Sequence, residues 1–238
     1  MLLTTLVLAP FVGSLLAALM PQDARNRESW LAIGVTVCGL LIGGLLFPQV
    51  ASGAVVRTEF AWLPAMGLNF ALRVDGLAWI FSMLVLAIGL LVVLYARYYM
   101  SAEDPVPRFF SFLLAFMGSM LGVVLSGNLV QLVVFWELTS LTSFLLIGYW
   151  HHRADARRGA RMAFTVTATG GLCLLVGVLL VGHIVGSYDL DAVLAAGDTI
   201  RAHALYLPAL VLVALGALTK SAQFPFHFWL PHAMAAPT

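Results

Sequence analysis

Long apolar runs, separated by short clusters of charged residues, make up most of the sequence. Seven such runs follow one another along the chain, at Leu2–Met20, Trp30–Phe47, Leu77–Tyr95, Phe109–Leu125, Leu129–Tyr149, Met162–Val185 and Ala204–Leu218. An α-helix needs about 20 apolar residues to cross the hydrocarbon core of a bilayer. The pattern therefore predicts an all-α membrane protein with about seven transmembrane helices.

The first apolar run is predicted to be a retained helix and not a signal peptide. Signal peptides begin with a basic segment, and no charged residue precedes Asp23. The run from Leu2 to Met20 is also long enough to cross a membrane.

The connections between the runs are short, and none resembles a flexible linker. Residues 48–76 form the longest early connection, and the weak alternation over Asn69–Val74 suggests a small hairpin within it. Residues 186–203 form a second, acidic loop. We therefore expect residues 1–238 to form a single transmembrane domain.

Basic residues are distributed unequally between alternate loops. Eight arginines lie in the loops 21–29, 96–108 and 150–161, whereas three lie in the opposite set. Cytoplasmic loops carry the excess of Lys and Arg. This rule predicts an N-terminus outside the cell and an extracytoplasmic 48–76 loop.

Composition agrees with a membrane protein and excludes several functions. The chain is 62% hydrophobic and 10% charged, with a mean hydropathy of +1.00, whereas soluble domains carry about 25% charged residues. The net charge of +1 gives no indication of a nucleic-acid partner. Cys38 and Cys173 lie in apolar runs and are interpreted as packing residues. The sequence contains no metal-ligand spacing, no phosphate-binding loop and no nucleophile with an evident base, so no metal, cofactor or enzymatic activity is expected.

Glu137 is the first candidate for a functional residue, because it lies near the middle of the run Leu129–Tyr149. A charged side chain at the centre of a membrane helix costs about 2.5–3.5 kcal/mol on insertion scales. Ser140 follows three residues later on the same helix face, and further hydroxyls come from Thr139, Thr142 and Ser143. These groups could hydrogen-bond the carboxylate or hold water beside it. The alternative is a structural Glu that holds two helices together.

Lys220 is the second candidate, deep in the last apolar run. Pro225 cannot donate a backbone hydrogen bond, and its ring clashes with the preceding turn, so the helix is predicted to break just past the lysine. Transporters place ion sites at such breaks. Gln223 and His227 follow Lys220 on roughly one face. The alternative for Lys220 is a side chain that extends to the lipid headgroups and has no role in transport. The alternative for His227 is a residue at the membrane boundary with no relay role.

Two motifs that contain these residues resemble a known superfamily. They are Phe135-Trp136-Glu137-Leu138-Thr139-Ser140 and the segment from Thr219 to Pro231, with the sequence TKSAQFPFHFWLP. Both are similar to the antiporter-like subunits of Mrp-type cation/proton antiporters and of the proton-pumping arm of respiratory complex I. Leu72–Leu77 resembles the same family. Phe224–Trp229 and Met234–Thr238 are most similar to the large A subunit of Mrp antiporters. His232 departs from the pattern, since an Asp or Asn is usual there.

The resemblance implies a role for each candidate residue. Glu137 and Lys220 correspond to the charge pair of the family's proton path, and His227 to the histidine that continues it. Ser140, Gln223 and Pro225 are supporting residues. By resemblance, the protein is a multi-pass subunit of a plasma-membrane complex that exchanges Na⁺ for H⁺ together with other membrane subunits.

Two rival functions stay open at this point. One is a proton-pumping subunit of a redox complex, either NADH-quinone oxidoreductase or a membrane-bound hydrogenase. The other is a structural subunit whose charges only hold helices together. Family members continue past Ala236-Pro237-Thr238 into a second inverted repeat, so the chain is expected to stop short of a complete transporter and to need the rest for transport.

Overall fold

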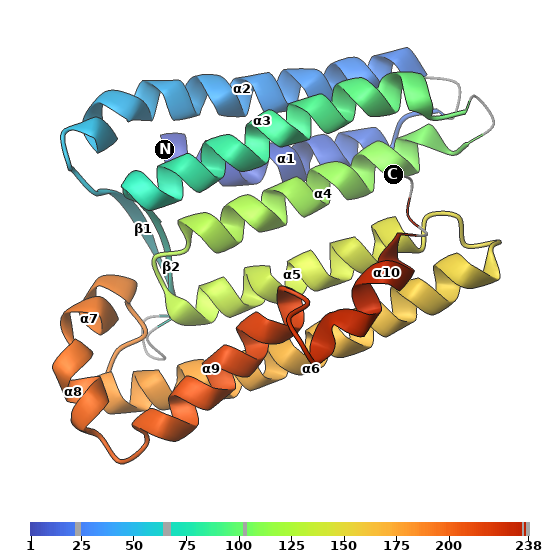
Figure 1. Cartoon of the computed structure of the whole chain (residues 1–238). Coiled ribbons are helices and arrows are strands. Elements are labelled where there is room, and N and C mark those ends of the chain that lie inside the picture. The colour runs from blue at the N-terminus through green and yellow to red at the C-terminus, as the bar shows by residue number, and fades with distance from the viewer. Residues whose placement is uncertain (22–24, 64–67, 102–103, 235, 237–238) are drawn as a thin grey trace. The chain divides into compact units, whose positions relative to one another are not determined.

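The computed structural model describes residues 1–21, 25–63, 68–101, 104–234 and 236 (Figure 1). The last part of the Met234–Thr238 motif, at 235 and 237–238, lies outside the described residues. By their internal contacts the residues form two compact units, Met1–Thr58 with Leu72–Leu125 and Glu59–Ala71 with Ser126–Thr238. The uniformly apolar sequence contains no signal for such a division. The single transmembrane domain stays a prediction.

The first unit contains four apolar helices: α1 (Leu2–Ala18), α2 (Arg25–Ala51), α3 (Gly76–Tyr99) and α4 (Val106–Leu125). Helix α1 packs against α4, and α2 against α3. Buried aliphatic side chains such as Val7, Leu86 and Leu121 fill the space between them. One buried polar contact, 3.1 Å between the hydroxyls of Ser14 and Ser111, joins α1 to α4.

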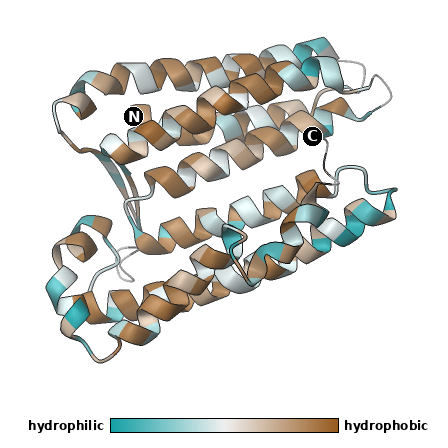
Figure 2. Ribbon diagram, viewed as in Figure 1, coloured by the Kyte–Doolittle hydropathy of each residue, from teal (hydrophilic) through white to brown (hydrophobic). Residues whose placement is uncertain are grey.

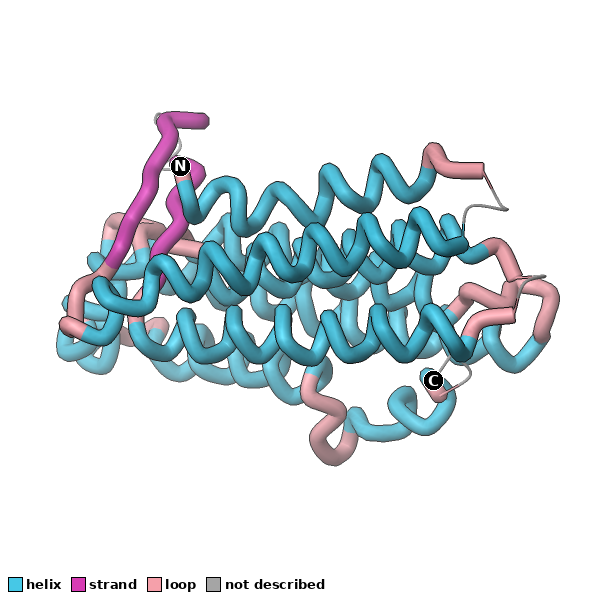
Figure 3. Tube along the Cα trace, turned by 90° about the horizontal axis from the view of Figure 1, so that it is seen from above, coloured by secondary structure: helices cyan, strands magenta, loops and turns pink. Residues whose placement is uncertain are grey.

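Two strands, β1 (Val56–Leu63) and β2 (Leu68–Val74), pair in a two-stranded sheet, drawn in magenta in Figure 3. The alternating segment Asn69–Val74 lies within β2. Asn69 Nδ2 donates to Glu59 Oε1 across the pair at 2.8 Å. The strands therefore carry a polar cross-strand contact of the kind that stabilises small sheets.

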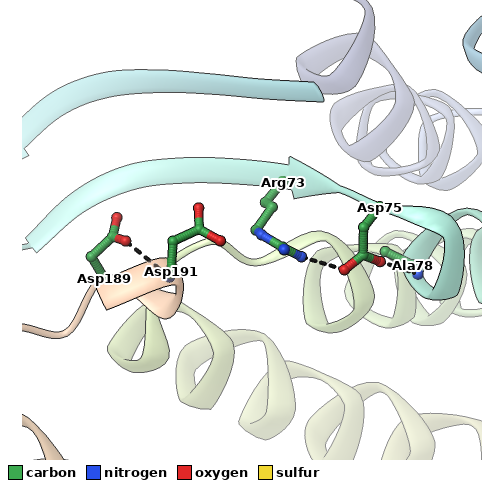
Figure 4. A network of polar contacts seen from close by, with 5 residues as sticks. All are labelled: Arg73, Asp75, Ala78, Asp189 and Asp191. Carbon is green, nitrogen blue, oxygen red and sulfur yellow. Dashed lines mark hydrogen bonds and ion pairs between the residues drawn. The ribbon is translucent and has the colours of Figure 1, made fainter. Parts of the chain in front are cut away.

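Asp75 sets the start of α3 directly after β2. Its carboxylate accepts a hydrogen bond from the backbone N–H of Ala78 at 2.9 Å and forms an ion pair with Arg73 (Figure 4). The bond from Ala78, and then the Arg73 guanidinium, hold the pKa of Asp75 below its usual value. The cap satisfies one of the N–H groups that a helix start leaves without an intrahelical acceptor.

The second unit is built on α5 (Leu129–Ile147) and the long α6 (Ala154–Val185). The short helices α7 (Leu190–Ala195) and α8 (Gly197–Ala202) lie in the predicted acidic loop. The chain then continues through α9 (Tyr206–Lys220), the 3₁₀ turn η2 (Phe226–Phe228) and α10 (Trp229–Ala233). Helix α6 packs against α5, α9 and α10 (Figure 1).

Asparagine and aspartate side chains fix where α5 and α7 begin. Asn128 Oδ1 accepts from the N–H groups of Val130 at 2.9 Å and Gln131 at 3.3 Å. Asp189 caps α7 by accepting from the N–H groups of Asp191 and Ala192 (Figure 4). Both are the N-cap arrangement that Asn and Asp favour, so the direction in which α5 leaves the loop is set by local hydrogen bonds.

Glycines allow α6 and α9 to pack closely. A Cβ added at Gly216 would lie 2.7 Å from Leu174 Cβ, and one at Gly177 would lie 3.0 Å from the backbone nitrogen of Val213. Only glycine leaves room for backbones this close. The close approach holds the end of α9 against the middle of the unit.

Helix α9 ends at Lys220, and helical structure resumes only at η2. Ala222 has a left-handed backbone (φ 51°). The N–H of Gln223 donates to Leu218 O at 3.0 Å and that of Ala222 to Thr219 O at 3.4 Å. These bonds are those of a Schellman motif. Pro225 adds to the break because the residue before a proline disfavours helical geometry.

Among the described residues, five helices have the length and composition of membrane spans: Asn26–Ala51, Gly76–Tyr99, Val106–Leu125, Leu129–Ile147 and Ala154–Val185. Helices α1 and α9 are apolar but shorter. In Figure 2 the helices are mostly brown, whereas α6 begins with a hydrophilic stretch. The chain is thus a mostly helical, multi-pass membrane protein. The number of seven crossings and the outward N-terminus stay predictions.

We predict that Ala222→Gly stabilises the protein. A left-handed conformation costs an L-residue about 1–2 kcal/mol, which glycine avoids, so the free energy of unfolding should rise by about 1 kcal/mol. Ala222→Val should lower it, since a branched side chain tolerates this backbone least. Denaturation in mixed micelles would measure both, and equal effects of the two substitutions would contradict the assignment.

Candidate functional site

Lys220, the last residue of α9, reaches across to α5. Its ammonium donates to Ser140 Oγ at 2.6 Å and to the backbone carbonyl of Trp136 at 3.2 Å. It also lies 5.4 Å from the centre of the Trp136 ring, within the range of a cation–π interaction. The lysine is thus held by neutral oxygens and an aromatic ring of a single helix.

The backbone carbonyl of Trp136 accepts hydrogen bonds from several side chains. Besides Lys220, it accepts from the hydroxyl of Thr139 at 2.6 Å and from that of Ser140 at 3.4 Å. A carbonyl oxygen has two lone pairs, so side chains compete for it. The same hydroxyl that binds Lys220 can therefore also turn back to its own helix.

Glu137 lies between these two partners of Lys220 on α5. Its Oε1 atom is buried and has no hydrogen-bond partner among the residues that the structure describes. Within the described part of the chain, no ion pair joins Glu137 to Lys220 or to another cation. The carboxylate rests against Gly171 of α6, where a Cβ would lie 2.6 Å from its Cδ. Among the described residues, the structure therefore places the carboxyl group of Glu137 and the ammonium of Lys220 against the same stretch of α5 without an ion pair between them.

The energies of the two arrangements are similar in size. A hydrogen bond to a charged group contributes about 1.5–3 kcal/mol. Two unit charges 4 Å apart attract each other by about 4 kcal/mol at the effective dielectric constant of a protein surface region. In the structure Lys220 makes two hydrogen bonds to neutral oxygens. In the alternative arrangement it would make one ion pair to Glu137.

The predicted site residues are only partly brought together. Lys220 and Ser140 are in direct contact, with Glu137 beside them. The side chain of Gln223 is exposed, and its backbone N–H closes the end of α9. His227 is exposed, with its ring 5.7 Å from that of Phe224. Among the described residues, the hydrogen bonds of Lys220 go to α5 and not to His227.

The segment after the break folds back on the unit. The indole N–H of Trp229 donates to the carbonyl of Thr219 at 3.0 Å. Trp229 and Ala233 pack on a buried cluster of Ile147, Ala160 and Ala163. Pro225 is exposed and forms the N-cap of η2. The broken helix is thus anchored on both sides of the break.

Two contributors to the site are not evident from the sequence. One is the backbone carbonyl of Trp136, since any helical residue has a carbonyl and its availability depends on where another helix ends. The other is Gly171, which follows a second glycine, Gly170, in an apolar run. A glycine pair inside a predicted helix is a signal for close packing, yet it does not reveal which side chain fills the space.

The site offers no arrangement for a resident metal. In the part of the chain that the structure describes, no group of three or more His, Cys, Asp or Glu side chains could hold a metal ion. The chemistry available at the site is that of a carboxylate, an ammonium and hydroxyls. These groups bind and release protons.

Two family models match the chain. Residues 126–238, which include the whole site, match the model described as NADH:quinone oxidoreductase/Mrp antiporter, TM. Residues 62–110 match the model described as NADH-ubiquinone oxidoreductase (complex I), chain 5 N-terminus.

Curated relatives and a solved structure show the same likeness. The chain is 65% identical over its whole length to the A/B subunit of a probable K⁺/H⁺ antiporter of Rhizobium meliloti, covering 24% of it. The A subunit of the Na⁺/H⁺ antiporter of Alkalihalophilus pseudofirmus is 42% identical over 97% of this chain and 29% of its own length. The Mrp complex of Dietzia sp. has a chain with a TM-score of 0.86 and 32% identity, over 99% of this chain and 25% of that one. The chain thus spans about a quarter of the length of these relatives.

We predict that Ser140→Ala destabilises the second unit, because Lys220 loses its hydroxyl acceptor. The free energy of unfolding should fall by about 1.5–3 kcal/mol, whereas Ser140→Thr should retain most of it. Ser119→Ala is a matched control, since this hydroxyl donates only to Ala115 of its own helix among the described contacts. Denaturation in mixed micelles would compare the variants, and equal losses at both serines would contradict the importance of the Lys220 bond.

Proposed function

The chain belongs to the antiporter-like superfamily of NADH:quinone oxidoreductase and Mrp antiporters, and from this we propose that it forms part of the large subunit of an Mrp-type cation/proton antiporter. In this proposal Glu137 and Lys220 carry protons. The observation that supports it most is that Lys220 of α9 and Glu137 of α5 lie beside one stretch of α5, where Lys220 binds neutral oxygens and Glu137 Oε1 is buried without a hydrogen bond among the described residues.

The proposed mechanism is an exchange of partners by Lys220. A deprotonated Glu137 attracts the ammonium, whereas a protonated Glu137 releases it to Ser140 and the Trp136 carbonyl. When the carboxyl gives up its proton, the pair can form again. Each cycle moves one proton through Glu137, and the change in charge moves Lys220. Buried charges in membranes commonly serve such relays.

His227 and the break after α9 extend this proposal. The exposed His227 lies past the break, where backbone groups are free to meet water or another part of the protein. We include it as a later group of the relay, with Gln223 and Pro225 as the residues that shape the turn. Its exposure in this structure makes it reachable by a proton donor outside the second unit.

The transported cation is proposed as K⁺ or Na⁺. The resemblance of the sequence motifs pointed to Na⁺. The relative with 65% identity is named for K⁺ and the one with 42% identity for Na⁺, so the proposal covers both. We also propose a plasma-membrane location, other membrane subunits as partners, and the orientation with an outward N-terminus.

The redox-complex alternative is less well supported. Both matching family models name NADH:quinone or NADH-ubiquinone oxidoreductase in their descriptions, but the curated relatives described above are named as parts of antiporters. This naming favours a role in transport over a role in an enzyme.

We predict that Glu137→Gln and Lys220→Ala each reduce antiport at least about tenfold while the complex still assembles, because each removes one proton-binding member of the relay. Glu59→Gln is the control, since this exposed carboxylate lies on β1. Antiport would be measured in inverted membrane vesicles by dequenching of a pH-sensitive dye. A stable variant with unchanged antiport would remove that residue from the mechanism, and loss of assembly would favour the purely structural role.

We further predict that Glu137→Gln reduces K⁺-driven and Na⁺-driven proton movement by the same factor. The single carboxylate at the site carries protons in this mechanism, and no cluster of acidic groups surrounds it among the described residues. Dequenching with each chloride salt in the same vesicles would show this. A loss confined to one cation would mean that Glu137 binds the cation itself.

A further inference from the structure

Gly171 of α6 faces the carboxylate of Glu137. A Cβ added at this glycine would overlap Glu137 Oε1 and would lie 2.6 Å from Cδ and 3.4 Å from Oε2. The Oε1 atom is buried and makes no hydrogen bond within the described part of the chain. The missing side chain therefore leaves a notch in α6 that is filled by an unpaired carboxylate oxygen.

Close helix packing does not explain this glycine. At Gly170 an added Cβ would meet Thr219, and at Gly177 it would meet Val213 and Ala209, all on α9. At Gly171 the three nearest atoms all belong to Glu137. A glycine inside a helix is destabilising relative to alanine, and here the space that it leaves is used by a single charged side chain.

We propose that Gly171 is a positioning residue that holds Glu137 apart from Lys220. This inference rests on the proposed relay and deepens it. With the carboxylate in the notch, Lys220 binds Ser140 and the Trp136 carbonyl; outside the notch, the carboxylate pairs with Lys220. Gly171 thus sets how readily the two charges separate, and separation is required in every cycle.

Alanine at this position should trap the pair. The group that the new methyl would displace is the far end of a flexible side chain, so the fold can adjust. The carboxylate has to move away from α6, and Ser140 with its bound Lys220 lies one helical turn further along α5. The result is a Glu137–Lys220 pair that no longer opens.

The test compares variants in the complete antiporter complex. Gly171→Ala should lower cation-dependent proton movement in inverted vesicles about tenfold, as expected for coupled residues in contact, with normal assembly. Gly44→Ala is the matched control, because a Cβ at this α2 glycine would meet nothing within 4 Å. Glu137→Asp shortens the side chain by one methylene. Glu137→Asp alone should reduce transport relative to the natural sequence. The double variant Gly171→Ala/Glu137→Asp should transport faster than Gly171→Ala alone, because the shorter acid avoids the methyl.

This reversal of sign is the result expected if Gly171 acts through Glu137, and normal assembly of Gly171→Ala separates that role from a merely structural one. Unchanged transport in Gly171→Ala would overturn the inference. So would a loss of transport when Glu137→Asp is added both to the chain with Gly171 and to the chain with Gly171→Ala. If Gly171→Ala prevents assembly, the double variant Gly171→Ala/Glu137→Asp must restore assembly. If neither variant assembles, the inference is also overturned. The proposed relay is judged separately: if Glu137→Gln abolishes transport and Gly171→Ala does not, only the role of Gly171 is wrong.

Discussion

A charge inside a membrane helix has to find its partners within the protein, and the bond from Lys220 to Ser140 and the Trp136 carbonyl meets that constraint. It links the end of α9 to α5, while α6 packs against both helices. It also uses neutral acceptors, and among the described residues Glu137 Oε1 is left without a hydrogen bond. A cation satisfied without its counter-ion can change partners, and this possibility is what the proposed relay requires.

The backbone around the site serves the same arrangement. The Schellman motif at Ala222 ends α9 at the lysine, so Lys220 extends toward α5 from a helix terminus. Gly177 and Gly216 bring α6 and α9 together, and Trp229 ties the segment after the break to Thr219. The proposed relay thus requires movement of two side chains only, within a packed frame. A relay built this way needs no large movement of the helices within the unit.

Sequence patterns predicted the apolar helices and the break between Lys220 and Pro225, because both follow from local chemistry: hydropathy and proline geometry. The intramembrane position of Glu137 and Lys220 stays a prediction. The hydrogen bond from Lys220 to Ser140 was less predictable, since the sequence predicted that Ser140 would support Glu137. That contact depends on where α9 crosses α5, which is decided by the tertiary packing of α6. Gly171 was missed for the same reason, because its role depends on the one side chain that happens to face it.

The most direct test is a structure of the complete complex, at a resolution that shows water, in acidic and in alkaline buffer. We predict that Lys220 stays with Ser140 where Glu137 is protonated and moves to Glu137 where it is not, with water beside both groups. An unchanged Lys220–Ser140 contact in both buffers, with the Glu137 carboxylate turned toward lipid, would contradict the relay and leave the two charges with a structural role alone.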